Sequence, residues 1–271
     1  MAASPERFNI AGDLLAGPDG DGRWNNLGYW KSAQNYTEAC RALAELHGVA
    51  AGLTASHRLL ELACGYGAAL GVWCGHFNVS QIAVLEYRPD CVRYIRSLRQ
   101  PTVDSVLMGR FDKPLDVLFP GPSFDAVICV DAAYHASSLA AFIAAAESVL
   151  AEQGVLVFST LVLADARPAG WLNDVLSSAA GIPPASLVTE SSLRQTVAAQ
   201  GLLVTVVEDI SDAVFAGLAD WVAGRSHHLN WRQKYSAGWF KIAATAHCCR
   251  RLAVSNTLRY VLVTVRRPAN S

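Results

Sequence analysis

The sequence has few charged residues, and its cysteines show no spacing typical of a metal site. Charged residues make up 17% of the 271 positions, and the formal net charge is −1. A near-neutral chain lacks the basic surface that attracts nucleic acid, so we expect no nucleic-acid partner. The seven cysteines include no CxxC pair, so we expect reduced, mostly buried thiols and no bound metal.

Long apolar segments, repeats and low-complexity stretches are absent as well. No uncharged apolar run reaches the roughly 18–20 residues that a bilayer-spanning helix needs. The N-terminal region lacks a basic stretch followed by an apolar block, so we expect no secretory signal and a cytoplasmic protein. Because 52% of the residues are hydrophobic, the composition instead favours a large buried core.

The most informative stretch is residues 59–67, which read Leu-Leu-Glu-Leu-Ala-Cys-Gly-Tyr-Gly. An apolar run containing Glu61 leads into small residues and glycines, and a helix-like pattern begins at Ala68. This order predicts a buried strand, a tight turn and a helix start, where backbone can approach a ligand closely. A pyrophosphate site has no adjacent negative charge, whereas a carboxylate suits a cationic ligand such as an α-amino group.

From residue 58 onward, strand-like runs alternate with helical stretches. Such alternation is typical of a parallel sheet with crossover helices. We expect strands at 58–62, 81–86, 103–107, 124–130, 154–160, 202–207 and 258–265. We expect helices near 34–51, 68–76, 89–99 and 138–151, another helical stretch around Trp171, and a helix beginning near Thr189. The predicted fold is α/β, with a doubly wound, mostly parallel seven-stranded sheet.

Polar side chains follow the second and fourth predicted strands. Glu86 ends the second strand, where an acid accepts hydrogen bonds from both ribose hydroxyls, and Tyr87 beside it can stack on adenine. The alternative for Glu86 is a helix-dipole partner. Val130, Asp131 and His135 follow the fourth strand. A histidine titrates near neutrality and can remove a proton from a hydroxyl, the alternative being a structural role.

These ordered segments together resemble the class I S-adenosylmethionine-dependent methyltransferases. Residues 61–67 match motif I of that family, acid-x-Gly-x-Gly-x-Gly, with Ala63 at the first glycine, which alanine tolerates if φ is negative there. Residues 124–127 resemble the Phe-Asp-x-Val strand of small-molecule methyltransferases. Residues 150–158 match the helix, turn and strand that follow it, and 208–211 resemble a segment of natural-product, sterol and tocopherol methyltransferases. The resemblance covers roughly residues 26–267.

The resemblance implies S-adenosylmethionine as cofactor and a small-molecule acceptor of apolar or aromatic character, with His135 as the catalytic base. The family usually has an aspartate that meets the adenine where this chain has Arg110, so the backbone of Arg110 and Phe111, or Asp112, remain alternatives for that contact. The implied cofactor-binding residues are Tyr29, Trp30, Glu61, Ala63, Cys64, Gly65, Gly67, Glu86, Tyr87, Arg110, Phe111, Val130 and Asp131.

The segment 212–253 is an insertion relative to a minimal fold. Apolar residues recur in it at three- and four-residue steps, which predicts one amphipathic helix through Trp231, Tyr235, Trp239, Ile242, Ala246, Cys249 and Ala253. We expect this lobe to cover the sheet's C-terminal edge as an acceptor lobe, with an apolar roof for a lipophilic acceptor. Its basic residues allow at most peripheral membrane contact, the alternative being a solvated face.

We expect residues 1–52 to form an N-terminal arm and lid helix, and residues 53–271 to form the methyltransferase domain that includes this lobe. Tyr29 and Trp30 either close over the cofactor as a lid or staple the arm to the core. The oligomeric state is not indicated by any pattern.

Two other functions are compatible with the sequence. A nicotinamide-dependent oxidoreductase would need fingerprint glycines at the positions of Ala63 and Ala68, and Glu61 would lie close to its phosphates. A binding protein that keeps the fold without turnover is the second alternative, since Arg110 departs from the family pattern.

Overall fold

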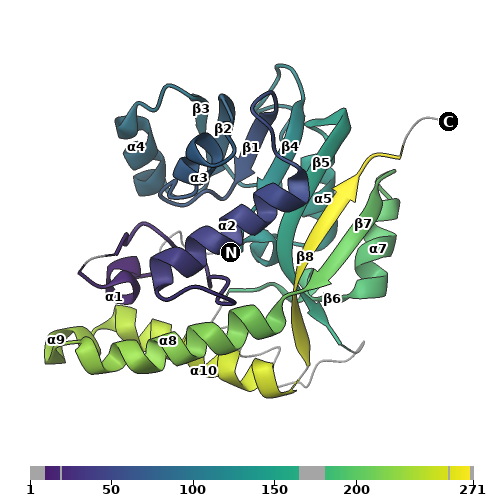
Figure 1. The fold of residues 1–271 in the computed structure, drawn as a ribbon. Coiled ribbons are helices and arrows are strands. Elements are labelled where there is room, and N and C mark those ends of the chain that lie inside the picture. Colours follow the sequence, from purple (N-terminus) through teal and green to yellow (C-terminus); the bar gives the residue numbers. More distant parts are fainter. Residues whose placement is uncertain (1–9, 19, 165–180, 256, 269–271) are drawn as a thin grey trace.

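The structure is a computed structural model that describes residues 10–18, 20–164, 181–255 and 257–268. Within these ranges the chain forms one twisted sheet with helices on both faces and further helices beyond one end of the strands (Figure 1). The predicted helical stretch around Trp171 lies outside the described residues.

The sheet follows the order β3-β2-β1-β4-β5-β8-β7, and a short strand, β6, pairs with β5 outside this path. Strands β1 to β5 are parallel, whereas β8 is antiparallel to β5 and β7. The strands are β1 Arg58–Leu62, β2 Gln81–Glu86, β3 Val103–Met108, β4 Phe124–Cys129, β5 Leu150–Leu163, β6 Val188–Thr189, β7 Leu203–Asp209 and β8 Leu258–Arg266. The predicted doubly wound, mostly parallel sheet is confirmed.

The strand order reverses at β1, which lies between β2 and β4. The connections that leave β1 and β4 therefore diverge, and a crevice opens at the carboxyl ends of these strands. Glu61 lies near the end of β1, Glu86 ends β2, and Asp131 follows β4, so the fold gathers the acids of the sequence motifs at this crevice.

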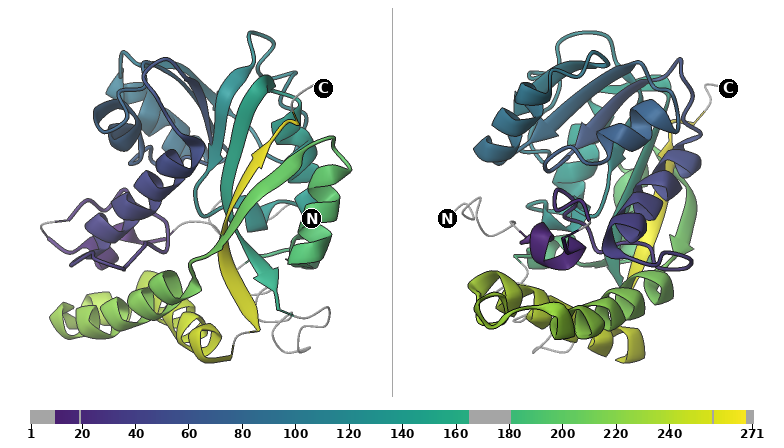
Figure 2. Two further views of the ribbon diagram at one scale, coloured as in Figure 1. Left: turned by 45° about the vertical axis from the view of Figure 1, so that its right-hand side comes forward. Right: turned by 60° about the vertical axis from the view of Figure 1, so that its left-hand side comes forward.

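Helices cover the two faces of the sheet as the alternation of side chains dictates (Figure 2). Leu59 belongs to the core shared with α2, α3 and α4, whereas Leu60 and Leu62 belong to the core beneath α5 and α7. These helices are α2 Tyr36–Ala51, α3 Leu70–Gly75, α4 Pro89–Leu98, α5 Leu139–Glu147 and α7 Glu190–Ala198.

Two boundaries differ from the expectation around β5. Helix α5 ends at Glu147 rather than near 151, and β5 begins at Leu150. The pairing register shifts here: Phe124 pairs with Leu150, whereas Ala126 pairs with Val155, so an irregular segment precedes the regular ladder. The two-residue strand β6 was not predicted, because two residues carry no readable period.

A helical lobe, defined here as residues 212–255, connects β7 to β8. It comprises a π-helical turn Asp212–Ala216, α8 Gly217–Arg225, a 3₁₀ turn Ser226–His228, α9 Trp231–Lys234 and α10 Ala237–Ser255. The lobe lies beyond the carboxyl ends of the parallel strands, beside the short N-terminal helix α1 Gly12–Ala16 (Figures 1 and 2). Two hydrogen bonds fix α1 there: Trp221 Nε1 donates to the Leu15 carbonyl, and Arg225 Nε donates to the Leu14 carbonyl.

The predicted single amphipathic helix is wrong in its extent. Trp231 and Tyr235 are 68% and 75% exposed, and only the later part of the pattern, from Trp239 onward, packs into the core. The reason is local capping. Ser236 Oγ accepts from the Trp239 amide at 3.2 Å, so the chain begins a new helix at Ala237 instead of continuing α9.

Helix α2 packs directly on the sheet. Its Tyr36 and Leu43 are fully buried in the core that contains β1 and β4 residues, and the side chain of Asn35 caps its first turn. This helix contributes to the same core as the strands. The predicted boundary near residue 52 between an arm and a main domain stays a prediction.

Candidate functional site

A cavity of about 380 Å³ lies between the carboxyl ends of the parallel strands and the helical lobe. Its volume falls in the usual range of small-molecule sites, ~300–1,000 Å³. Most of its lining comes from the N-terminal segment, the strand ends and α10, and Ile182 and Phe215 add to it from other segments. The predicted residues that line it are Glu61, Ala63, Cys64, Gly65, Glu86, Tyr87, Arg110, Phe111, Val130, Asp131 and His135.

The glycine turn after β1 brings backbone to the cavity wall. Gly65 has a φ of +62°, a conformation that glycine adopts without strain. Gly67, with φ of +71°, has another role: a Cβ there would lie 2.9 Å from Leu70 and 3.1 Å from Ile95. Gly67 therefore permits close packing of the turn against α3 and α4, and it is not among the described lining residues.

Ala63 was expected to replace the family glycine with a negative φ, and this expectation is wrong. Its φ is +57°, in the left-handed region, rather than negative. The amide of Ala63 donates to the Leu85 carbonyl at 2.8 Å, so the neighbouring strand β2 holds this conformation. The cost for a residue with a Cβ is about 1–2 kcal/mol.

Glu61 is buried beside the cavity, with its side chain held from α3. Its Oε2 accepts from Trp73 Nε1 at 2.8 Å. Burial raises the pKa of Glu61 to about 8, an effect that the Trp73 hydrogen bond opposes and the nearby Glu86 reinforces. A cationic group bound next to Glu61 would favour its ionised form.

Glu86 is 4% exposed, and its carboxylate connects the end of β2 to the glycine turn. Oε2 accepts from the Gly65 amide at 2.7 Å, and Oε1 accepts from the Arg88 amide at 2.9 Å and from Arg88 Nε at 3.0 Å. Arg88 also lines the cavity. The sequence interpretation missed it, although a cation two residues after a strand-end acid is a visible signal.

Arg110 and Asp112 pair with each other beside the aromatic part of the wall. Arg110 Nε and Nη2 donate to the two carboxylate oxygens of Asp112 at 2.9 and 2.7 Å, and Asp112 also accepts from the Ser137 amide at 2.6 Å. The Arg110 guanidinium lies 5.6 Å from the ring centroid of Tyr87. Arg110 and Phe111 line the cavity, whereas Asp112 is not among the described lining residues.

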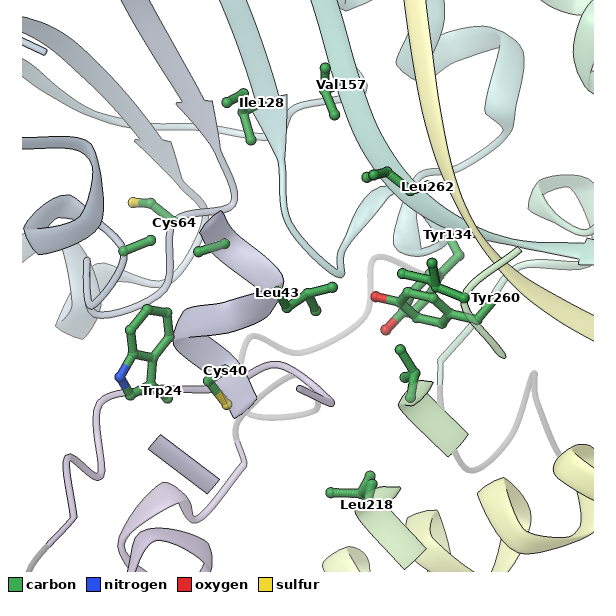
Figure 3. Packing of buried hydrophobic residues seen from close by; sticks show 14 of the residues in the cluster. Trp24, Cys40, Leu43, Cys64, Ile128, Tyr134, Val157, Leu218, Tyr260 and Leu262 are labelled. Carbon is green, nitrogen blue, oxygen red and sulfur yellow. The ribbon is translucent and has the colours of Figure 1, made fainter. Parts of the chain in front are cut away.

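Asp131 joins three distant segments. Its Oδ2 accepts from the Leu27 amide at 2.7 Å, and its Oδ1 accepts from the hydroxyls of Tyr134 and Tyr260, each at 2.6 Å. Figure 3 shows these two tyrosines converging from different elements. Burial raises the pKa of Asp131 to about 6, although all three hydrogen bonds favour the ionised form. Its φ of +53° is a further sign of a conformation imposed by the surrounding structure.

His135 lies in the short 3₁₀ turn Ala133–His135 that follows β4, and it lines the cavity. Its ring packs against Tyr134, with ring centroids 4.5 Å apart. Its backbone amide donates to the Ala132 carbonyl at 2.9 Å. His135, the proton acceptor predicted from the sequence, is thus half-buried at the wall of the cavity.

Tyr29 and Trp30 are not among the described residues that line the cavity. Trp30 lies against Trp221 of α8, with ring centroids 5.6 Å apart, and its Nε1 donates to the Leu27 carbonyl at 2.9 Å. Trp30 thus packs against the helical lobe, and the two alternatives for Tyr29 and Trp30, a lid or a staple, stay predictions. Among the described residues, the tryptophan that lines the cavity is Trp24, which is not one of the site residues predicted from the sequence.

One face of α10 forms the opposite wall of the cavity. Lys241, Thr245, Cys248 and Leu252 recur at steps of three and four residues, and all line the cavity. The apolar residues of the sequence indicated the neighbouring face of α10, which contains Trp239 and is buried in the core. The face that lines the cavity was not predicted, because its small and polar residues form no apolar pattern.

The described residues contain no group of three or more His, Cys, Asp and Glu residues placed to hold a metal ion. They also contain no helix that is long and apolar enough to cross a membrane.

Comparison with known proteins identifies the chain's relatives. The family model described as a methyltransferase domain matches residues 29–207. The erythromycin 3''-O-methyltransferase of Saccharopolyspora erythraea is 26% identical over 211 residues, which are 74% of this chain and 69% of that enzyme.

Solved structures share the whole fold. Mycolic acid cyclopropane synthase CmaA1, crystallised with SAH and CTAB, superimposes with a TM-score of 0.74 at 17% identity, covering 97% of this chain and 94% of that chain. Geranyl diphosphate C-methyltransferase from Streptomyces coelicolor A3(2) gives a TM-score of 0.69 at 15% identity, covering 98% and 99% of the two chains. Since the family match spans more than half of the sequence, this protein belongs to the methyltransferase domain family, and it is an S-adenosylmethionine-dependent methyltransferase with the class I fold.

Proposed function

We propose that this protein methylates a hydroxyl group of a small, largely apolar acceptor, with His135 as the general base. The observation that carries the proposal is that one cavity is lined by the strand-end acids, by His135 and by the inner face of α10. A cofactor at the strand ends and an acceptor under the lobe would then share one enclosed space.

The strand ends have the chemistry that S-adenosylmethionine requires. Glu61 would receive the α-amino group of the methionyl part, since it is a buried acid beside the cavity. Glu86 would accept from the ribose hydroxyls, and the open backbone at Gly65 allows close approach of the ligand. Tyr87 and Phe111 offer ring faces for the adenine.

When bound, the cofactor supplies an electrophilic methyl carbon on a sulfonium. The protein's own contributions are positioning, exclusion of water and acceptance of one proton. As the acceptor oxygen forms its new bond to carbon, its proton would pass to the imidazole of His135, which later releases it to solvent. A metal ion or a covalent intermediate is not needed for this balance.

The acceptor side of the cavity suits a molecule with a mostly apolar body. Trp24, Phe215, Leu161, Ile182 and Leu252 line it, and a few polar side chains from α10 stand among them. The curated relative is named as an O-methyltransferase, which favours oxygen as the methylated atom. Neighbours crystallised with CTAB or geranyl diphosphate hold ligands with long apolar chains.

Replacement of His135 by alanine tests the proposal. Turnover with an accepted hydroxyl substrate should fall by ~10²–10⁴, the usual contribution of a general base, while affinity for S-adenosylhomocysteine stays unchanged. The wild-type rate should rise with pH as the imidazole loses its proton. His76→Ala is a matched control, because His76 lies at the end of α3 with 47% of its side chain exposed.

An active His135→Ala variant with a flat pH profile would make His135 a structural residue. Methylation of carbon, or of an acceptor that is already ionised in water, would then be the better assignment. Isothermal titration with S-adenosylhomocysteine and NADH separately tests the choice of cofactor.

A further inference from the structure

The guanidinium of Arg88 occupies the acceptor atoms that a cofactor ribose would use. Its Nε donates to Glu86 Oε1 at 3.0 Å, and its Nη2 lies 3.4 Å from Oε2. The Arg88 and Gly65 amides take further positions on the same two oxygens. A carboxylate has about four lone-pair sites, so this carboxylate is saturated.

Arg88 also lies over the open side of the glycine turn. A Cβ built on Gly65 would be 3.3 Å from Arg88 Nη2 and 3.7 Å from the side-chain amide group of Asn25. The space that glycine leaves free for a ligand therefore faces the guanidinium. The guanidinium therefore lies beside the glycine turn, and Arg88 and Gly65 both line the cavity.

The N-terminal segment takes part in the same arrangement. With the Asn25 amide nitrogen donating to the Trp24 carbonyl at 2.8 Å, its oxygen accepts from Arg88 Nη1 at 3.2 Å. The guanidinium further lies 5.8 Å from the ring centroid of Tyr66. With only 12% of its side chain exposed, Arg88 is held from several sides in the orientation that meets Glu86.

We propose that Arg88 sets cofactor affinity by competing with the ribose hydroxyls for Glu86. Both hydroxyls must donate to the carboxylate, and both oxygens already accept from the guanidinium, so the side chain has to turn away when the ribose enters. The charge-assisted pair lost in this exchange opposes binding. The inference rests on the proposed function, in which Glu86 receives the ribose.

Removal of the guanidinium should therefore tighten binding. Arg88→Ala is expected to bind S-adenosylhomocysteine about threefold to tenfold more tightly than the wild type in isothermal titration, since one charged hydrogen bond no longer has to be broken. Arg88→Met keeps an unbranched side chain without the charge, and it should show the same gain if the alanine variant folds poorly. Arg93→Ala is the matched control: Arg93 lies on α4, which begins directly after Arg88, is 75% exposed and is absent from the described cavity lining.

A second ligand separates competition from simple steric blocking. The 2′,3′-dideoxyribose analogue of S-adenosylhomocysteine does not donate to Glu86, so it leaves the Arg88–Glu86 pair intact. Arg88→Ala should gain nothing for this analogue. An equal gain for both ligands would overturn competition for the carboxylate, and so would unchanged affinity for S-adenosylhomocysteine. Weaker binding by the variants would make Arg88 a cofactor ligand and overturn the inference as well.

The proposed role of Glu86 and the competition by Arg88 are contradicted by different results. If the wild type does not bind S-adenosylhomocysteine, or if Glu86→Ala binds it as tightly as the wild type, the proposed role of Glu86 fails. If Glu86→Ala loses affinity and Arg88→Ala does not gain it, only the competition by Arg88 fails.

Discussion

The two walls of the cavity are built on different principles. At the strand ends, buried acids each have a specific partner: Trp73 donates to Glu61, Arg88 pairs with Glu86, and two tyrosines donate to Asp131. On the opposite wall, α10 offers small and apolar side chains such as Cys248 and Leu252. The first wall depends on polar partners, whereas the second depends on how the lobe packs.

This difference indicates which changes each wall tolerates. A buried charge or hydroxyl whose partner is removed becomes destabilising, because its desolvation is no longer compensated. On α10, the described contacts of the Cys248 and Leu252 side chains include no hydrogen bond of this kind. The size and polarity of these two side chains can therefore vary. We therefore expect the strand-end wall to bind the invariant part of the reaction, the cofactor, and the α10 wall to select the acceptor.

The largest expected effect concerns the packing that holds the α10 wall in place. Trp239 is 7% exposed within the core, so Trp239→Ala should lower the free energy of unfolding by about 3–5 kcal/mol. Chemical denaturation measures this value. Trp231→Ala is the control: this tryptophan of the same lobe is 68% exposed, and its loss should stay within about 0.5 kcal/mol. Similar losses for both would show that the lobe packs differently.

A smaller effect is expected from Asp131, which ties the N-terminal segment to the strand-end wall. Asp131→Ala leaves the Tyr134 and Tyr260 hydroxyls and the Leu27 amide without this acceptor, so unfolding should become easier by about 2–4 kcal/mol. Hydrogen exchange should also show faster exchange at the Leu27 amide. Unchanged exchange there would mean that Asp131 does not hold the segment.

The smallest effect is expected at Glu61. The same substitution there should weaken cofactor binding and raise the stability of the unliganded protein at pH 8. Glu61→Gln should weaken binding of S-adenosylhomocysteine by about 1–3 kcal/mol, the scale of a charged hydrogen bond. Isothermal titration measures the loss. Equal affinity of variant and wild type would contradict the role of Glu61 as the ammonium acceptor.

The pH dependence of the unliganded protein checks the same residue. The pKa of Glu61 rises from an ordinary 4.5 to about 8 on folding, so between these values the folded state keeps a proton that the unfolded state loses. This contribution to stability is present below pH 4.5 and is lost as the pH rises toward 8. Glu61→Gln removes it, and its melting temperature should exceed that of the wild type at pH 8. A wild type that is as stable as the variant there would contradict the raised pKa.

Local sequence patterns were sufficient for the strands and for most of the strand-end wall. A short apolar run followed by glycines marks where a buried strand ends, and the end of a parallel strand is where a ligand meets the sheet. Glu61, Glu86 and His135 could therefore be assigned to one edge before any coordinates were known. Cap residues were equally readable, since Thr189 begins α7 as expected.

Other features depend on neighbours that are distant in the chain. The positive φ of Ala63 is imposed by pairing with Leu85 of β2, and no local rule predicts it. Trp30 turned out to pack on α8 while Trp24 faces the cavity, which depends on where the N-terminal segment crosses the lobe. The break between α9 and α10 follows from the capping by Ser236. The apolar residues that recur on both sides of Ser236 instead predicted one continuous helix.

The sequence by itself determined the fold class, the position of the glycine turn and the acids at the strand ends, because these follow from short-range periodicity and from the geometry of parallel strands. Only the tertiary structure decided which face of α10 closes the cavity and that Arg88 covers Glu86. Both depend on side chains brought together over long sequence separations, where the packing of the lobe and the crowding of charges around one carboxylate select a single arrangement.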